Sequence, residues 1–253
     1  MLGSVLLVLL ALQAMLPTDA STNIQMLLRW IHFLAGIIWI GLLYFFNLVN
    51  VPVMKALDAP TKGKVVPVLM PKALWWFRWG AVVTVLAGII YYLIILSTEP
   101  PQAPGSLMWA TFGKWLLCVV VAWGIIYFLL RPKQGALNDG RVLALLILIV
   151  VSLMGGAIVH WNTYEGSSNR ALSIGVGGGL GTIMLLNVWG IIWPCQKRII
   201  GWTRASAEQG TPIPPESAKL ARQAFLASRT NAWLSIPMLF FMAAASHYPM
   251  FGK

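Results

Sequence analysis

The chain has few acidic residues and few charged residues of any kind. Its 253 residues include seven Asp and Glu and 18 Lys and Arg, and charged residues make up only 10%. Soluble domains carry about 25% charged residues, so this composition, with 58% hydrophobic residues, excludes a water-soluble fold. The two cysteines, Cys118 and Cys195, lie in apolar runs. They provide no disulfide framework, no CxxC zinc pair and no CxxCH for a covalently attached haem.

Long apolar runs are abundant instead. A bilayer core of about 30 Å requires roughly 20 apolar residues per helix, and none of the runs shows the period-2 alternation of a transmembrane β-strand. The sequence therefore predicts an all-α fold, a polytopic transmembrane helical bundle that forms a single domain over residues 21–253. Its six core spans are expected at residues 28–50, 74–96, 107–130, 142–160, 174–195 and 232–247.

Residues 1–20 precede this domain and allow two interpretations. The stretch from Leu2 to Leu16 is apolar but short, and the small residues Thr18 and Ala20 after it fit a signal-peptidase site. No Lys or Arg precedes the apolar stretch, unlike in a signal peptide. A short N-terminal helix and a removed signal peptide both stay open.

The basic residues gather in alternate loops. Segments 51–73, 131–141 and 197–230 hold 13 of the 18 Lys and Arg residues, whereas segment 97–106 has none and segment 161–171 has only Arg170. Short cytoplasmic loops are enriched in Lys and Arg, so we expect these three segments inside and the C-terminus outside. Most of the net charge of +11 is then explained by the orientation of the chain in a lipid bilayer. No nucleic-acid partner is expected.

The longest of these loops contains an amphipathic run. Residues 216–230 follow Pro212, Pro214 and Pro215 and alternate basic and apolar residues with helical spacing. This pattern predicts a short cytoplasmic helix that lies on the membrane surface.

Three histidines, His32, His160 and His247, fall near the outer ends of their predicted spans. His32 is the deepest, and Lys114 lies at a similar depth. Ionisable residues within a membrane are costly and therefore indicate function, and neutral imidazole is a common ligand of haem iron. On the same helix, Gly36 and Trp39 leave room for a flat macrocycle. The alternative is that His160 and His247 are interfacial anchors and that the Lys114 ammonium extends to the headgroups.

Two arginines, Arg29 and Arg170, lie near the same outer boundary. Together with Lys114 they would form a cationic mouth above the histidines, suited to an anionic planar substrate or a quinone headgroup. The alternative is that they pair with Asp19, Glu99 and Glu165, the acids expected on that side.

Three stretches of the sequence resemble a known family. They are Leu28-Arg-Trp-Ile-His-Phe-Leu-Ala-Gly-Ile-Ile-Trp-Ile-Gly-Leu-Leu-Tyr-Phe45, Gly181-Thr-Ile-Met-Leu-Leu-Asn-Val-Trp-Gly-Ile-Ile-Trp-Pro-Cys-Gln-Lys197 and residues 231–249 with Ser246-His-Tyr-Pro249. These stretches are similar to the membrane domain of bacterial membrane-bound urate hydroxylase. The similarity spans nearly all of the chain from residue 25 onward.

This resemblance implies a multi-pass protein of the bacterial inner membrane whose C-terminus lies on the periplasmic side. The family is described as oxidising urate to 5-hydroxyisourate and passing the electrons to a fused cytochrome c domain. This chain contains no CxxCH, so the resemblance implies a separate cytochrome c as the acceptor. The chain also has Gly175 where the family tends to carry a histidine shortly before the Gly-Thr-Ile-Met stretch.

A more distant resemblance concerns the cofactor. The pattern of His32, Trp39, Gly41 and Tyr44, followed by Lys114, is similar to b-haem-binding membrane protoporphyrinogen oxidases and copper-resistance-type membrane proteins. It implies haem b held by His32 and Lys114, in competition with His160 and His247. A transition metal such as copper at His32, His160 and His247 is the alternative.

The sequence thus supports a urate hydroxylase-type oxidoreductase with a haem or metal site near the outer face. The alternative is a non-catalytic membrane subunit of a larger respiratory or redox complex. A solute transporter ranks lowest, because neither a broken-helix repeat nor a buried carboxylate pair is visible.

Overall fold

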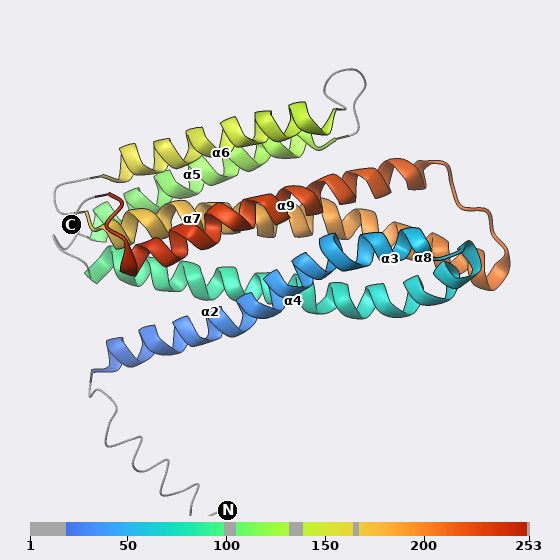
Figure 1. Cartoon of the computed structure of the whole chain (residues 1–253). Coiled ribbons are helices and arrows are strands. Elements are labelled where there is room, and N and C mark those ends of the chain that lie inside the picture. Colours follow the sequence, from blue (N-terminus) through green and yellow to red (C-terminus); the bar gives the residue numbers. More distant parts are fainter. Residues whose placement is uncertain (1–18, 99–104, 132–138, 164–166, 252–253) are drawn as a thin grey trace, which may run out of the picture.

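The computed structural model describes residues 19–98, 105–131, 139–163 and 167–251. These residues are almost entirely helical and contain no strand (Figure 1), so the predicted all-α bundle is confirmed. Residues 1–18, for which the helix and the signal peptide both stay open, lie outside the described residues.

The helices run antiparallel along one common direction (Figure 1). Two of the described helical stretches contain a short π-helix, labelled η, that continues directly into the next α-helix. In chain order the elements are α2 (Ala20–Tyr44), η1 (Phe45–Asn50), α3 (Val51–Ala56), α4 (Ala59–Thr98), α5 (Gly105–Leu129), α6 (Gly140–Asn162), α7 (Asn169–Asn187), η3 (Val188–Ile192), α8 (Trp193–Gln209) and α9 (Glu216–His247).

Within the part of the chain that the structure describes, five helical stretches are long and apolar enough to cross a membrane, as expected of a multi-pass membrane protein. They are Ala20–Ala56, Ala59–Thr98, Leu107–Leu129, Gly140–Asn162 and Asn169–Gln209. The sixth predicted span lies within α9, which packs along α7 (Figure 1). Helix α9 is less apolar because it carries polar side chains such as Asn231 and Ser235, and both of these are buried inside the bundle.

Helix α7 occupies the middle of the bundle and contacts α4, α5, α6 and α9. Its glycine-rich run, 175–181, permits this close approach. A Cβ atom at Gly177 would lie 3.3 Å from the Met238 backbone oxygen on α9, and one at Gly179 would lie 3.2 Å from Ile158 on α6. Tight helix packing is therefore the role of the glycine run.

The predicted surface helix at residues 216–230 is wrong. Residues 216–247 form one continuous helix, α9, that passes through Pro237 without ending. The reason is burial: Ala224 and Ala227 already face the interior, and Asn231 and Leu234 continue the same buried stripe. The segment 216–230 is thus the first half of the last helix of the bundle.

Candidate functional site

His32 lies on α2 against α4 and is partly buried. Its Nδ1 atom is 2.8 Å from the backbone oxygen of Thr84. A carbonyl oxygen only accepts hydrogen bonds, so Nδ1 carries the ring proton and Nε2 of the neutral ring keeps its lone pair. The lone pair makes Nε2 the atom that can accept a proton or bind a metal.

Gly88 makes this position of the imidazole ring possible. A Cβ atom at residue 88 would lie 3.1 Å from Cε1 and 3.2 Å from Nδ1 of His32. Any other residue would push the ring away from Thr84. Two residues of α4 therefore fix the position of the His32 ring. The Thr84 backbone oxygen accepts its hydrogen bond, and Gly88 leaves space for it.

The two predicted substrate residues, Arg29 and Arg170, meet at Tyr91 of α4. The Cζ atoms of Arg29 and Arg170 lie 5.3 Å and 5.2 Å from the centroid of the Tyr91 ring. Arg170 also donates a hydrogen bond to the Tyr91 hydroxyl and a second, 3.5 Å long, to Oε1 of Gln25. Three helices, α2, α4 and α7, thus bring two guanidinium groups to one aromatic ring.

This cluster lies next to His32 along both helices that build it. Arg29 precedes His32 by three residues on α2, and Tyr91 follows Gly88 by three residues on α4, so each pair shares one helix face. Arg29 is exposed and Arg170 is half-buried. We call Arg29, Tyr91 and Arg170, with His32 beside them, the arginine site.

Asp19, one of the predicted acidic partners, has a different role. Its carboxylate caps α2 by accepting hydrogen bonds from the backbone N–H and the hydroxyl of Thr22. These bonds hold the pKa of Asp19 below its usual value. Glu99 and Glu165, the other two predicted partners, lie outside the described residues.

The other predicted ligands are not gathered around His32. Lys114 is exposed on α5, which packs chiefly against α6 and α7, whereas α2 packs chiefly against α4. His160 and His247 are exposed in the last turns of α6 and α9. Within the described part of the chain, no group of three His, Cys, Asp or Glu residues could hold a metal ion.

A haem held between two helices of this chain does not fit these residues. His32 has the tautomer of a ligand, but Lys114 is exposed on α5, which packs chiefly against α6 and α7 and not against α2. The room expected beside Gly36 and Trp39 is taken up by α4. A Cβ atom at Gly36 would lie 3.7 Å from Thr84, and Trp39 is only 1% exposed. Small residues on this face admit a neighbouring helix rather than a macrocycle.

Two aromatic side chains fill the space next to Gly175. The Gly175 backbone oxygen accepts a 2.7 Å hydrogen bond from the Trp115 indole, and a Cβ atom at residue 175 would lie 2.9 Å from the Tyr92 hydroxyl. The Tyr92 and Trp115 rings contact each other at 5.6 Å. A histidine at residue 175 would have to displace Tyr92, so the glycine here is required by the core.

Sequence reasoning missed Arg78, although a cation within the apolar run 74–96 is a signal in itself. Its guanidinium stacks on Trp193, with Cζ 3.4 Å from the ring centroid, and lies 5.3 Å from Trp189. Its Nε donates a 3.1 Å hydrogen bond to the Leu74 backbone oxygen. Cation–π contacts of this kind tie α4 to η3 and α8.

Sequence reasoning also missed a row of polar side chains along α9 that lie between the helices. Asn187 donates to Asn231 Oδ1 at 2.9 Å, and Asn231 donates to the Met184 backbone oxygen at 2.9 Å. Both asparagines have no exposed surface. Two further contacts lie one turn before and one turn after Asn231 along α9. Asn47 donates to Ser228, and Tyr44 contacts Ser235, each at 2.9 Å. We call the side chains of these six residues the amide layer: Tyr44, Asn47, Asn187, Ser228, Asn231 and Ser235.

The amide layer coincides with the π-helices η1 and η3. Asn47 lies within η1, and η3 begins directly after Asn187. Such helices are often found at functional positions. The sequence does contain a signal for this layer, because Asn47 and Asn187 are polar residues inside the predicted spans 28–50 and 174–195.

Comparison with known protein families gives a match. A family model described as urate oxidase N-terminal matches residues 57–253, which is most of the chain. The match covers Tyr91, Arg170 and the amide layer on α7 and α9, while α2, with Arg29 and His32, precedes it. No curated protein and no solved structure matches the chain.

Proposed function

The chain belongs to the urate oxidase N-terminal family, and from that premise we propose that it is a membrane oxidoreductase of the urate hydroxylase type. We further propose that the arginine site binds the urate anion. The protein would lie in a bacterial inner membrane with this site on the periplasmic side, as the distribution of basic loops indicates.

The observation that carries this proposal is the convergence of Arg29 and Arg170 on Tyr91. Urate is a planar monoanion at neutral pH with several carbonyl oxygens. Guanidinium groups match such a ligand in two ways, because they donate paired hydrogen bonds to oxygen and stack on flat rings. Partial burial of Arg170 strengthens its attraction for an anion relative to that of a fully solvated charge.

The reaction defines what the residues beside the anion must do. Urate and one water molecule become 5-hydroxyisourate, with the release of two electrons and two protons. A water molecule that attacks the purine ring needs a proton acceptor, and Nε2 of His32 keeps a lone pair for that role because Nδ1 is bonded to Thr84. Arg29 and Arg170 would hold the anion and offset its charge while the electrons leave.

The electrons require an acceptor that this chain does not itself provide as a CxxCH-bound haem. We propose a separate cytochrome c that docks at the same end of the bundle. Each urate would then reduce two cytochrome c molecules by one electron each. Residues of the chain bind and orient urate in this scheme, and electron transfer depends on the partner.

Turnover by the purified protein tests the proposal. We expect urate-dependent reduction of added cytochrome c, with the loss of urate absorbance and a ratio of about two cytochromes per urate. An absorption spectrum and a metal analysis of the same preparation test whether His32 holds a cofactor. Failure to consume urate with several cytochromes c and with a soluble one-electron acceptor would contradict an enzymatic role. It would favour the non-catalytic membrane subunit.

A further inference from the structure

The bundle has a step at the end that carries the basic loops. Helices α5 and α6 have 25 and 23 residues, whereas α4 and α9 have 40 and 32. Helix α4 ends at Thr98 and α5 begins at Gly105, both at the opposite end of the bundle (Figure 1). At 1.5 Å per residue, α5 extends about 38 Å and α4 about 60 Å. The α5–α6 pair therefore ends first, and α4, α8 and α9 continue past it (Figure 1).

The step lies at the level where α5, by its length, would leave the membrane. A hydrocarbon core of about 30 Å is crossed by α5 with one turn or two to spare. The end of α5 thus lies among the lipid headgroups, and the first half of α9 lies beside it. Any recess between the two is open to both the headgroups and the solvent.

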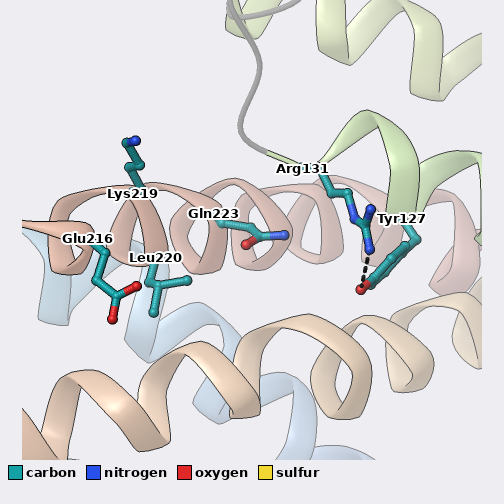
Figure 2. Close-up of a pocket in the computed structure, with 6 residues that line it drawn as sticks. All are labelled: Tyr127, Arg131, Glu216, Lys219, Leu220 and Gln223. Carbon is teal, nitrogen blue, oxygen red and sulfur yellow. Dashed lines mark hydrogen bonds between the residues drawn. The ribbon is translucent and has the colours of Figure 1, made fainter.

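A pocket of about 500 Å³ occupies this place (Figure 2). Two of its residues lie at or just past the end of α5, and four come from the first two turns of α9. They are Tyr127, Arg131, Glu216, Lys219, Leu220 and Gln223. We call this recess the step pocket.

The charges around the step pocket favour an anion. Arg131 and Lys219 both line the recess and make it positively charged, and the Lys219 side chain extends away from Arg131 (Figure 2). The Glu216 carboxylate is bound by Arg198 of α8 at 2.5 Å, and this contact offsets its negative charge. Tyr127 and Gln223 add uncharged hydrogen-bond donors.

Arg131 follows the end of α5 and is held in place by two aromatic side chains of that helix. Its guanidinium donates a 3.4 Å hydrogen bond to the Tyr127 hydroxyl, and Cζ lies 5.0 Å and 5.4 Å from the Tyr127 and Phe128 rings. The cation is therefore already placed before a ligand arrives, so less conformational entropy is lost on binding.

An apolar strip adjoins this cation on α5. Phe128 is 61% exposed and Ile125 is 46% exposed, and both belong to the span that crosses the membrane. Leu220 continues the apolar surface into the pocket. A ligand with a phosphate at the step and acyl chains along α5 would match both surfaces at once.

We propose that the step pocket binds the phosphate group of an anionic phospholipid, with the acyl chains lying against Ile125 and Phe128. Basic recesses between membrane helices are suited to such headgroups because Arg and Lys donate to phosphate oxygens at the interface. The proposal is independent of the urate reaction, since the arginine site lies at the other end of the bundle.

Native mass spectrometry of the purified, delipidated protein tests the proposal. The protein is titrated with phosphatidylglycerol, phosphatidylcholine or inorganic phosphate, and the bound copies are counted. We expect wild type to retain phosphatidylglycerol at least tenfold more tightly than phosphatidylcholine. The variant Arg131→Gln with Lys219→Gln should lose this preference, because the phosphate then meets no cation.

The matched control is Lys55→Gln with Lys64→Gln. Both lysines are exposed at the same end and lie outside the pocket, and the control removes the same charge. The proposal requires the control to behave as wild type. Equal phosphatidylglycerol binding by the pocket variant and wild type would overturn it. Displacement of the lipid by millimolar inorganic phosphate would overturn the assignment to a lipid and show a site for free anions.

Discussion

The arginine site and the amide layer both join helices through polar side chains, but they do so with different chemistry. The arginine site uses two cations and a tyrosine, and Arg29 remains exposed. The amide layer uses uncharged amides and hydroxyls, and Asn187, Asn231 and Ser235 have no exposed surface. A buried neutral group needs only a hydrogen-bond partner, whereas a buried charge also loses hydration. Charge at the rim therefore suits ligand binding, and amides in the interior suit helix packing.

The sharpest test of this comparison removes Arg170. We expect Arg170→Gln to lower kcat/KM for urate by about 100-fold, which corresponds to about 2.7 kcal/mol. The loss should appear mainly in KM, because the guanidinium holds the anion. Steady-state kinetics with cytochrome c reduction measure it, and Arg141→Gln, an exposed arginine on α6, is the control. An unchanged KM would remove Arg170 from the binding site.

The next test is aimed at the amide layer. Asn231→Ala leaves the Asn187 amide and the Met184 carbonyl without their buried partner. We expect the free energy of unfolding to fall by about 2 kcal/mol, with KM for urate unchanged. Denaturation in mild detergent measures the first quantity, and Ser246→Ala, exposed on the same helix, is the control. A raised KM with unaltered stability would reverse the roles assigned to the two regions.

A smaller effect is expected at Gly88. The Cβ atom of Gly88→Ala would lie 3.1 Å from the His32 ring, so the ring must move by a few tenths of an ångström. We expect about 1 kcal/mol of destabilisation and a decrease in kcat of about tenfold without a matching change in KM. Gly113→Ala is the control, because its Cβ atom meets nothing within 4 Å. Equal kinetics for both variants would show that the exact position of the His32 ring does not affect the reaction.

The smallest effects are expected at Lys114, His160 and His247. All three side chains are exposed and lie away from the Thr84 contact of His32. Each single change to Gln should leave kcat/KM within about twofold and the absorption spectrum unaltered. Loss of a haem or metal signal in any of these variants would instead support a cofactor bound by that residue.

The sequence alone was sufficient for the fold because apolar length dominates a membrane helix. The runs at 74–96 and 142–160 lie inside α4 and α6. The ends of helices were harder to predict. Residues 216–230 read as a separate surface helix because their outward face is basic, while the buried stripe through Ala224 and Ala227 becomes evident only when α7 and α8 are in place.

The site was predictable in part for a related reason. Charge at the rim of a span identified Arg29 and Arg170, but Tyr91, which joins them, resembles any interfacial tyrosine. The expected cavity beside Gly36 and Trp39 was an error of the same origin, because small residues on a helix face admit either a ligand or a neighbouring helix. The Cβ position at Gly36, 3.7 Å from Thr84, shows which of the two occupies this face.

Equilibrium dialysis of labelled urate, without any electron acceptor, tests the central claim most directly. In that condition binding is measured apart from turnover. The account predicts saturable binding by wild type and by Lys114→Gln, and binding at least 100-fold weaker in Arg29→Gln with Arg170→Gln. Equal affinity in the double arginine variant would contradict the assignment of urate to the arginine site.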